Sequence, residues 1–388
     1  MYCVAVFLDL RKAFDVCSHE ILLNKLKKMG IQNTAHKWFT SYLSGRSQCV
    51  DIEGLFSEFI ELAISVIQGS TLGPILFLCY INDFWAATTL FSVLFADDTT
   101  GLAKGHNLRE LTLFVNNELQ KIANWFRSNK MAVNTKKTKF IVFRPHGKQI
   151  DPDDCILLYN NNEIGKPADP DLISTVDRIH NNGTEKSFKL LGVLFDEYLS
   201  FKAHISHLCS KISKSLYCIN RIKNFVDEES LKKLYFAMIH SSLLYCINVY
   251  GCATKTALEP LIIKQTQAIR TILKTNYRGH TLPLFTKTGI LPLLQLIKYA
   301  HVKFMHSYHH KTLPLAFAET WTPNRERNPD RVLRNADDYT IPPHRIELVK
   351  RLPLYSIPLV WNSTTADKSI PVQHVFLKAV KEILFANI

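Results

Sequence analysis

Three aspartates in apolar surroundings are the residues of this chain that are best suited to chemistry. Asp97 and Asp98 stand between two stretches, 92–96 and 99–103, that are rich in β-branched and apolar residues and are predicted to pair as a hairpin. Because successive side chains of a strand face opposite ways, adjacent carboxylates converge only where the backbone turns. Asp9 follows an apolar run of strand length, at what we expect to be a sheet edge. By itself the Asp-Asp pair also fits a solvated turn.

Carboxylates gathered at the ends of two strands can hold a pair of Mg²⁺ ions about 3.5–4 Å apart, the arrangement that supports in-line phosphoryl transfer. Magnesium prefers hard oxygen ligands and takes further ones from substrate phosphates. Without a cation, three clustered carboxylates would raise one another's pKa values. The sequence therefore predicts a divalent cation wherever Asp9, Asp97 and Asp98 cluster.

A Gln-Gly segment lies between these aspartates, at residues 65–74 with the sequence S-V-I-Q-G-S-T-L-G-P. Gly69 and Gly73 permit close approach of the backbone, and Pro74 suits the first turn of a helix expected over 72–84. A turn that leads into a helix N-terminus can bind a phosphate or a sugar through its N–H groups. A plain strand-to-helix turn is an equally good interpretation of this segment.

The elements that must position these residues follow from periodicity and end signals. Ser18 and the Asn107–Glu110 pair are predicted to cap helices, and residues 165–186 are predicted to form a loop. The helix over 72–84 is apolar nearly all round, so we expect it to be buried. Helices are expected over 18–29, 34–43, 72–84 and 107–129, and strands over 2–8, 48–52, 59–63, 139–143, 155–159 and 188–195.

Helical spacing dominates the chain after about residue 200, where Lys and Arg residues are frequent. Such residues usually form a solvated helix face, and a stripe facing nucleic acid is the alternative. We divide the chain into 1–200, an α+β domain, 201–280, a helical domain, and 281–388, a proline-rich helical and irregular region. Helices are expected over 205–225, 227–245, 258–273, 293–309 and 372–385.

Composition narrows the class of protein. The chain has 388 residues, a formal net charge of +13 and 47% hydrophobic residues, which indicates a globular protein with a polyanionic partner such as nucleic acid. No apolar run reaches the roughly 18 residues of a membrane span, and no basic leader precedes the first apolar run. Nine scattered cysteines without metal-binding spacing favour a reducing compartment. We expect an intracellular protein, in the nucleus, the cytoplasm or both, that is neither secreted nor membrane-bound.

In order and spacing, residues 7–15 (F-L-D-L-R-K-A-F-D), 65–74 and 95–98 (F-A-D-D) resemble the successive palm motifs of reverse transcriptases. Other segments are similar in particular to the enzymes of non-long-terminal-repeat, LINE-like retrotransposons. These segments are G-R-S-Q at 45–48, Y-I-N-D at 80–83, N-T-K-K-T at 134–138, L-G-V-L-F-D at 191–196, the helical block at 234–245 and G-I-L-P-L at 289–293.

The resemblance implies an α+β fold, with a right-hand polymerase palm made of an antiparallel sheet of about four strands backed by two or three helices. A helical thumb and a C-terminal region would follow. It also implies an RNA-directed DNA polymerase that transfers nucleotides from dNTPs to a DNA primer on an RNA template, with two Mg²⁺ ions or Mn²⁺ in their place.

Residue by residue, the resemblance makes Asp9 and Asp97 the main metal ligands, places Asp98 close to the primer terminus and adds the backbone carbonyl of Leu10 as a ligand. Lys137 would protonate the pyrophosphate leaving group, which is a general-acid role.

The remaining roles concern the substrates. Phe14 would lie under the nucleotide sugar and exclude a 2′-hydroxyl, and Gln68 and Gly69 would contact the incoming nucleotide and the template. Leu191 and Gly192 would help to grip the primer.

The sequence departs from the family pattern in two respects. Ile67 stands where the family usually has proline, and the family's fingers lie upstream of the strand that bears Asp9, so we expect a chain that lacks most of the fingers. The alternative function is therefore a catalytically inactive nucleic-acid-binding remnant. An RNA-directed RNA polymerase shares the two-metal palm, but Phe14 argues against it.

Overall fold

The computed structural model describes residues 1–67, 69–161, 172–275, 280–327, 338–343 and 347–386. The chain forms two compact units. The first consists of Met1–Phe188 and Asp196–Tyr198, and the second of Lys189–Phe195 and Leu199–Ile388. Within the described residues, no helix is long and apolar enough to cross a membrane.

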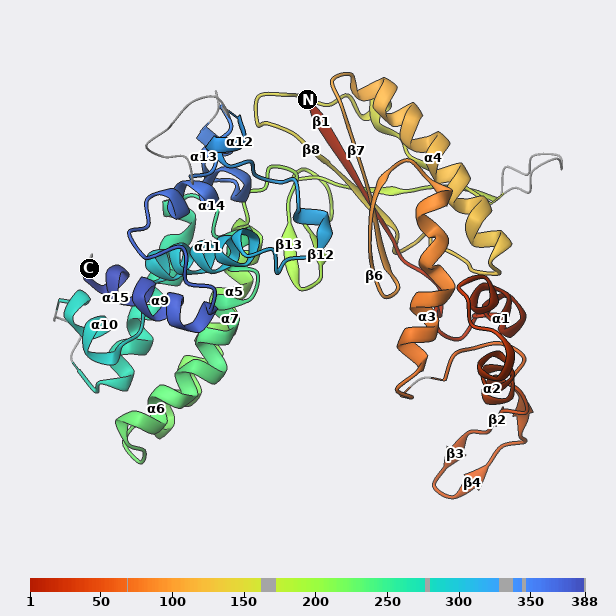
Figure 1. The fold of residues 1–388 in the computed structure, drawn as a ribbon, viewed down its shortest axis with the longest axis horizontal. Helices are drawn as coiled ribbons and strands as arrows, with labels where there is room; N and C mark the ends of the chain where they lie inside the picture. The colour runs from red at the N-terminus through yellow and green to blue at the C-terminus, as the bar shows by residue number, and fades with distance from the viewer. Residues whose placement is uncertain (68, 162–171, 276–279, 328–337, 344–346, 387–388) are drawn as a thin grey trace. The chain divides into compact units, whose positions relative to one another are not determined.

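A five-stranded sheet in the order β11-β8-β1-β7-β6 lies at the centre of the first unit (Figure 1). β1 pairs antiparallel with both β7 and β8, and β6 pairs antiparallel with β7, as we expected for the palm. β11 instead runs parallel to β8, which corrects the predicted loop over 165–186. The strands are β1 (Tyr2–Leu8), β6 (Phe91–Phe95), β7 (Asp98–Gly105), β8 (Lys139–Phe143) and β11 (Asp177–Ile179).

The central strand β1 has both of its faces covered, as its unbroken apolar run predicts. Val4, Val6 and Leu8 belong to the core that the sheet shares with helices. Alternate residues face the other way, and there Phe7 stacks on Phe188 with ring centroids 4.0 Å apart. This packing fixes the strand that delivers Asp9.

Helices α1 (His19–Lys28) and α3 (Gly73–Ile81) are tied together through the fully buried Tyr80. The Tyr80 hydroxyl accepts from the backbone N–H of Ser18 at 3.3 Å and donates to the carbonyl of Asn129 at 2.6 Å. The expectation that helix α3 is buried on all sides is wrong, because Ile75 and Leu78 are about half exposed. The neighbouring helix is α2 (Asn33–Leu43), and a 3₁₀ turn, η1 (Asn82–Ala87), follows α3.

Helix α4 (Leu108–Ser128) lies along the sheet and begins at the predicted cap (Figure 1). Asn107 Oδ1 accepts from the backbone N–H of Arg109 at 3.0 Å and from that of Glu110 at 3.4 Å, and Asn107 Nδ2 donates to Glu110 Oε1 at 3.0 Å. Its apolar side, which includes Leu111 and Val115, packs into the core.

A buried carboxylate of α4 holds the chain that leads into β6. Glu118, which is 2% exposed, accepts from Thr88 Oγ1 at 2.7 Å, from the Thr89 N–H at 2.6 Å and from Lys121 Nζ at 2.6 Å. Burial acts to raise the pKa of Glu118, but these hydrogen bonds outweigh it and lower the pKa to about 2. The ionised carboxylate therefore stabilises the approach to the strand that precedes Asp97.

We expect the substitution Glu118→Gln to lower the free energy of unfolding at pH 7 by about 3 kcal/mol, which is the lowered pKa expressed as energy. Because the folded-state pKa is depressed, this contribution is present above the unfolded value of 4.5 and is lost as the pH falls towards about 2. Urea unfolding of both proteins between pH 7 and pH 3 measures the difference. A difference that does not shrink with falling pH would contradict the assignment.

Short strands of the described residues form further pairs in which the expected boundaries need correction. The predicted pairing of 48–52 with 59–63 is replaced by β2 (Ser47–Gln48) with β5 (Ile60–Glu61), and by an inner hairpin of β3 (Asp51–Ile52) and β4 (Leu55–Phe56). The chain turns back early because Glu53 and Gly54 both have positive φ. The predicted strand over 155–159 is a 3₁₀ turn, η2 (Pro152–Cys155), followed by β9 (Leu158–Asn160), which pairs with β10 (Ile173–Thr175).

The second unit is helical after a short hairpin. The predicted single strand over 188–195 is wrong: β12 (Phe188–Leu190) and β13 (Val193–Phe195) are joined by a turn at Leu191-Gly192. The expected helix over 227–245 is interrupted by a π-helical segment, η4 (Phe236–His240).

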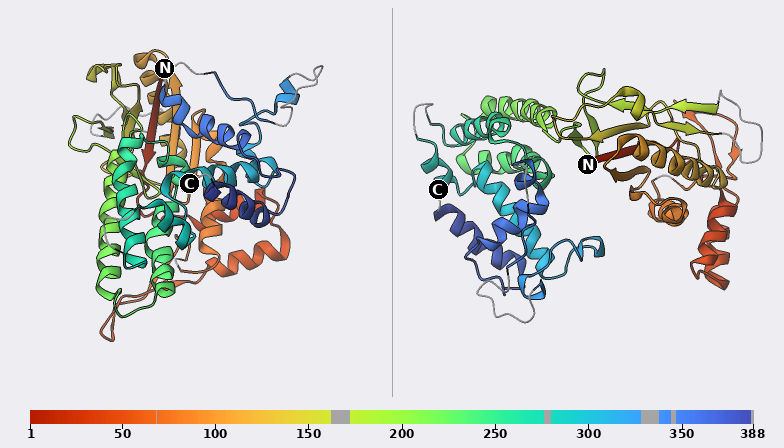
Figure 2. Two further views of the ribbon diagram at one scale, coloured as in Figure 1. Left: turned by 90° about the vertical axis from the view of Figure 1, so that its left-hand side faces the viewer. Right: turned by 90° about the horizontal axis from the view of Figure 1, so that it is seen from above.

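Helices α5 and α9 of this unit pack side by side (Figure 2). The predicted division at residues 200 and 280 into palm, thumb and C-terminal region stays a prediction. The helices are α5 (Lys202–Ile222), α6 (Glu228–Tyr235), α7 (Ser241–Leu244), α8 (Ile247–Tyr250), α9 (Lys255–Ile272), α10 (Leu282–Thr288), α11 (Leu293–His309), η5 (Leu315–Phe317), α12 (Asn324–Arg327), α13 (Glu347–Arg351), α14 (Pro353–Asn362) and α15 (Gln373–Ala386).

Candidate active site

The hairpin that carries the paired aspartates turns one residue earlier than predicted. β6 ends at Phe95 and β7 begins at Asp98, so the turn consists of Ala96 and Asp97. Ala96 has a φ of 51°, a left-handed conformation that residues other than glycine adopt at a cost. Asp98 is thus a strand residue, and its side-chain direction is set by the pleat of the sheet.

Strand register brings Asp98 next to Asp9. The pairing of β1 with β7 ends at Leu8 opposite Thr99, and Asp9 and Asp98 are the residues next to this last pair. Antiparallel partners point to the same face, with Cβ atoms about 4.5–5.5 Å apart. Phe95 pairs with Asp98 from the other side and lies 62% exposed on this face. The register therefore gathers two carboxylates from distant parts of the sequence on one face of the sheet.

The electrostatics of Asp98 agree with this placement. Burial raises the pKa of the Asp98 carboxyl, and the negative charges of Asp97 and Asp9 raise it further. A raised carboxyl pKa means that the fold holds the charged form at a cost, which a bound cation would offset. The charges of Asp97 and Asp9 therefore both act on Asp98 in the folded chain.

In the described residues, no group of three or more His, Cys, Asp or Glu side chains lies close enough to hold a metal ion by itself. Two neighbouring carboxylates with hard oxygen atoms still suit Mg²⁺, which usually binds through one or two carboxylates together with water and substrate phosphates. The chemistry of the donor set therefore fits a divalent ion that arrives with a nucleotide.

The backbone around Asp9 is held by the predicted N-T-K-K-T segment. The Asp9 N–H donates to Oγ1 of the fully buried Thr138 at 3.2 Å, and the Asp9 carbonyl accepts from the Asn134 N–H at 2.7 Å. Leu10 forms an isolated antiparallel bridge with Val133. The hydrogen bonds of this bridge are made by the residues on either side, so none of them uses the Leu10 carbonyl.

Lys137 belongs to the same turn. Its N–H donates to the Asn134 carbonyl at 3.1 Å, and its side chain is exposed. One residue further on, Thr138 contacts the backbone of Asp9. The structure thus places Lys137 in the segment that supports Asp9.

The Gln-Gly loop is closed by a serine hydroxyl. Ser70 Oγ donates to the Ile67 carbonyl at 2.8 Å and accepts from the Gly73 N–H at 2.9 Å, just where α3 begins. Gly69 has a φ of 79°, which explains glycine at that position. Gln68 lies outside the described residues.

Gly73 has no room for a side chain, because a Cβ atom there would lie 2.4 Å from the Ile67 carbonyl oxygen. We expect Gly73→Ala to displace the loop and to lower the free energy of unfolding by about 1–3 kcal/mol, as overpacking does. Gly147→Ala is the matched control, because nothing lies within 4 Å of a Cβ atom at Gly147. Equal unfolding midpoints for the two variants in urea would show that the loop tolerates the methyl group.

Phe14 is attached to the Gln-Gly loop. Its ring stacks on Phe77 of α3 with centroids 4.5 Å apart, and its carbonyl accepts from the Val66 N–H at 2.9 Å. The ring is half-buried, so one part remains accessible. The structure thus joins Phe14 and the loop, and their contact with a nucleotide stays a prediction.

Leu191 and Gly192 form a two-residue turn in which both have positive φ, 44° and 84°. This is the conformation of a type I′ hairpin turn. The Tyr245 hydroxyl donates to the Leu191 carbonyl at 2.5 Å, and a Cβ atom at Gly192 would lie 3.3 Å from the Tyr245 ring. These residues belong to the second unit, and their primer-gripping role stays a prediction.

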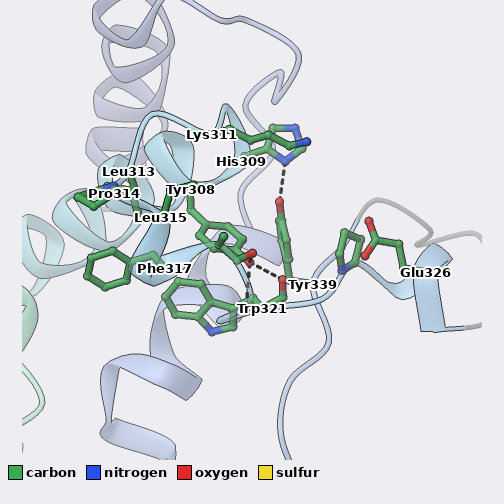
Figure 3. Close-up of a pocket in the computed structure, with 12 residues that line it drawn as sticks. Tyr308, His309, Lys311, Leu313, Pro314, Leu315, Phe317, Trp321, Glu326 and Tyr339 are labelled. Carbon is green, nitrogen blue, oxygen red and sulfur yellow. Dashed lines mark hydrogen bonds between the residues drawn. The ribbon is translucent and has the colours of Figure 1, made fainter. Parts of the chain in front are cut away.

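Some supporting residues were missed by sequence reasoning. Thr138 binds the backbone of Asp9 and Ser70 closes the Gln-Gly loop, and no local pattern singles out their hydroxyls. A cavity of about 350 Å³ also escaped prediction; it lies within the second unit and has aromatic walls that include Tyr308, Phe317 and Trp321 (Figure 3).

Comparisons with known proteins identify the class. The family model described as "Reverse transcriptase (RNA-dependent DNA polymerase)" matches residues 1–195, which is half of the chain. The chain therefore belongs to the reverse transcriptase family. This confirms the resemblance inferred from the palm motifs, and the fold is an α+β polymerase palm followed by helices.

Relatives come from mobile elements. The chain is 25% identical over 283 residues to the "RNA-directed DNA polymerase from mobile element jockey" of Drosophila melanogaster, a match that covers 70% of this chain and 28% of that protein. It is 26% identical over 294 residues to the "Probable RNA-directed DNA polymerase from transposon BS" of the same organism, covering 72% and 30%. The chain thus spans less than a third of the length of these relatives.

Among solved structures, a telomerase from Candida albicans in complex with a fragment of telomeric RNA is 13% identical, and the match covers 82% of this chain and 48% of that one. Its TM-score is 0.33, and we draw nothing further from it.

Proposed function

We propose that this chain forms the catalytic palm and the helical thumb of an RNA-directed DNA polymerase of a LINE-like retrotransposon. The observation that supports it best is the strand register that ends at Leu8 opposite Thr99 and so brings Asp9 next to Asp98, beside the turn residue Asp97. Membership of the family supports the same chemistry. The comparisons do not favour the alternative of an inactive nucleic-acid-binding remnant.

In the proposed reaction, the 3′-oxygen of the primer bonds to the α-phosphorus of a dNTP, and the bond from that phosphorus to the pyrophosphate oxygen breaks. The 3′-hydroxyl proton leaves to solvent, and Lys137 gives a proton to the departing pyrophosphate. When bound, two divalent ions, Mg²⁺ or Mn²⁺, would lower the pKa of the 3′-hydroxyl and stabilise the leaving group. Asp9, Asp97, Asp98 and the Leu10 carbonyl would hold them, with Asp98 also near the primer terminus.

The remaining residues position the substrates. Phe14 lies under the sugar and excludes a 2′-hydroxyl, while Gln68 and Gly69 contact the base pair that forms. Leu191 and Gly192 hold the primer. The partners are an RNA template, a DNA primer and dNTPs, and the site of action is intracellular, in the nucleus, the cytoplasm or both.

Primer extension on an RNA template with Mg²⁺ and dNTPs tests the proposal, with Asp97→Ala as the control. Extension by the wild-type chain and none by the variant supports the polymerase. Template binding without extension, weakening steeply with salt because counterions are released, would support the nucleic-acid binder instead. Preferential incorporation of ribonucleotides would overturn the role of Phe14.

A further inference from the structure

A small cavity within the second unit has a mainly apolar wall into which two basic side chains are set, one from η4 and one from α15. Its volume is about 110 Å³, enough for several water molecules. His240 and Lys381 contribute the titratable side chains of its lining, and Gly289 of the G-I-L-P-L motif lies at its wall. The polymerase chemistry proposed above gives this cavity no role.

A third basic group approaches the same wall. Nζ of Lys232, on α6, lies 3.9 Å from the position that a Cβ atom would take at Gly289. Glycine at this position, with a φ of 65°, leaves the space beside the ammonium group open. In the part of the chain that the structure describes, no ion pair joins Lys232, His240 or Lys381 to a carboxylate.

The positive charges of these basic groups repel one another when no anion lies among them. Burial lowers the pKa of Lys381, and the charge of Lys232 lowers it further. Burial likewise lowers the pKa of His240, and Lys381 adds to that effect. Like charges brought together on three separate elements cost free energy unless a negative charge lies among them.

His240 also carries an unpartnered polar atom. Its Nδ1 is buried and has no hydrogen-bond partner. Buried polar atoms of this kind normally pair with protein, water or ligand. His240 ends the π-helical segment η4, and such one-turn π-helices occur frequently at functional sites.

We propose that this cavity binds a tetrahedral oxyanion of the phosphate class, held by Lys232, His240 and Lys381. His240 of η4 and Lys381 of α15 line this space, Lys232 of α6 approaches its wall at Gly289, and the volume suffices for one phosphoryl group. The phosphoryl group comes either from inorganic phosphate or from the backbone of a bound nucleic acid, whose sugar and base remain outside. The site does not depend on polymerase activity.

Inorganic phosphate is the probe for the first experiment, titrated into the full-length chain at constant ionic strength. We expect a saturable rise of the melting temperature, because a ligand that binds only the folded state stabilises it. In Lys381→Gln, the loss of one charged hydrogen-bond donor should weaken binding by about tenfold or more. This variant also relieves repulsion, so misfolding is not expected to hide the result.

Lys233→Gln is the matched control, because Lys233 neighbours Lys232 in sequence but is 74% exposed and pairs with Glu229 at 3.0 Å. It should bind phosphate like the wild type. The side-chain ¹⁵N resonances of His240 provide a second readout, which should shift on addition of phosphate. An unchanged melting temperature and unchanged resonances, or equal binding by Lys381→Gln, would overturn the proposal.

A short single-stranded RNA distinguishes the two sources. If the RNA displaces phosphate and moves the His240 resonances, whereas an RNA with uncharged methylphosphonate linkages does not, the occupant is a backbone phosphate. If neither RNA competes, the occupant is the free anion.

Discussion

Under the proposed function, replacing Asp9 with asparagine is expected to reduce the rate of primer extension by about a thousandfold or more, because the loss of a carboxylate proposed to bind metal costs several kcal/mol of transition-state stabilisation. Asparagine keeps the size of the side chain, and the backbone hydrogen bonds to Thr138 and Asn134 do not involve the carboxylate. The variant should therefore fold normally. Single-turnover extension rates at saturating Mg²⁺ measure the effect.

Asp51→Asn is the control, because Asp51 is exposed in the hairpin β3–β4 and its Oδ1 accepts from the Gly54 N–H at 2.9 Å, which an amide oxygen can also do. Its extension rate should equal that of the wild type. Adding Asp98→Asn to Asp9→Asn should cost much less than the two single losses combined, since both carboxylates are proposed to serve one metal site. Full additivity would indicate that the two carboxylates act separately.

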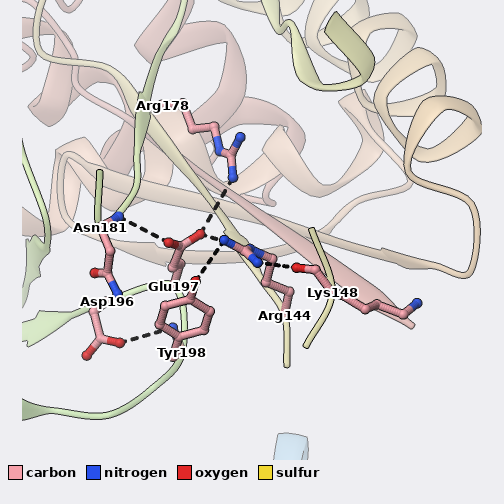
Figure 4. A network of polar contacts seen from close by, with 7 residues as sticks. All are labelled: Arg144, Lys148, Arg178, Asn181, Asp196, Glu197 and Tyr198. Carbon is pink, nitrogen blue, oxygen red and sulfur yellow. Dashed lines mark hydrogen bonds and ion pairs between the residues drawn. The ribbon is translucent and has the colours of Figure 1, made fainter. Parts of the chain in front are cut away.

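Replacing Glu197 with alanine is expected to lower the free energy of unfolding of the first unit by about 3–5 kcal/mol, the range for breaking a buried ion pair. Glu197 is 2% exposed and accepts from Arg144 Nε at 3.0 Å, with an Arg178 nitrogen at 3.5 Å and the Asn181 N–H at 3.1 Å (Figure 4). Alanine would leave two partly buried guanidinium groups without this carboxylate.

Urea unfolding measures this loss, with Glu185→Ala as the control. Glu185 is 55% exposed and lies 3.6 Å from Lys139, so its removal should cost at most about 1 kcal/mol. The double variant Arg144→Met/Glu197→Met should recover part of the stability, because it removes two of the buried charges together. Equal losses in Glu197→Ala and Glu185→Ala would show that the buried network contributes little.

Local pattern was sufficient where one physical signal dominated. β1, β8 and α11 have the predicted bounds, because an unbroken apolar run or a regular 3.6-residue spacing leaves few alternatives. The helix cap at Asn107 was predicted correctly for a similar reason, because its hydrogen bonds join residues that are at most three positions apart. For these elements the sequence contains the whole explanation.

Pattern failed where backbone conformation or distant contacts decided the outcome. Leu191 adopts a left-handed conformation inside an apolar run, so a hairpin looked like one strand. Ala96 also adopts a left-handed conformation, so the turn consists of Ala96 and Asp97 and does not include Asp98 as predicted. The hydrogen bond between Asp9 and Thr138 spans 129 residues, and no local window could predict it. The three aspartates were predicted from residue type and family motifs, whereas their support came only from the tertiary structure.

The segment Asp196–Tyr198 belongs to the first unit, to which Glu197 binds it, although the residues on both sides of the segment belong to the second unit. The polypeptide passes between them after Phe188, after Phe195 and after Tyr198. A single proteolytic cleavage after Phe188 would leave the segment Asp196–Tyr198, which binds Arg144, on the C-terminal fragment. The two fragments of the cleaved protein should therefore stay associated through this segment. Two separately expressed fragments should likewise be able to complement each other.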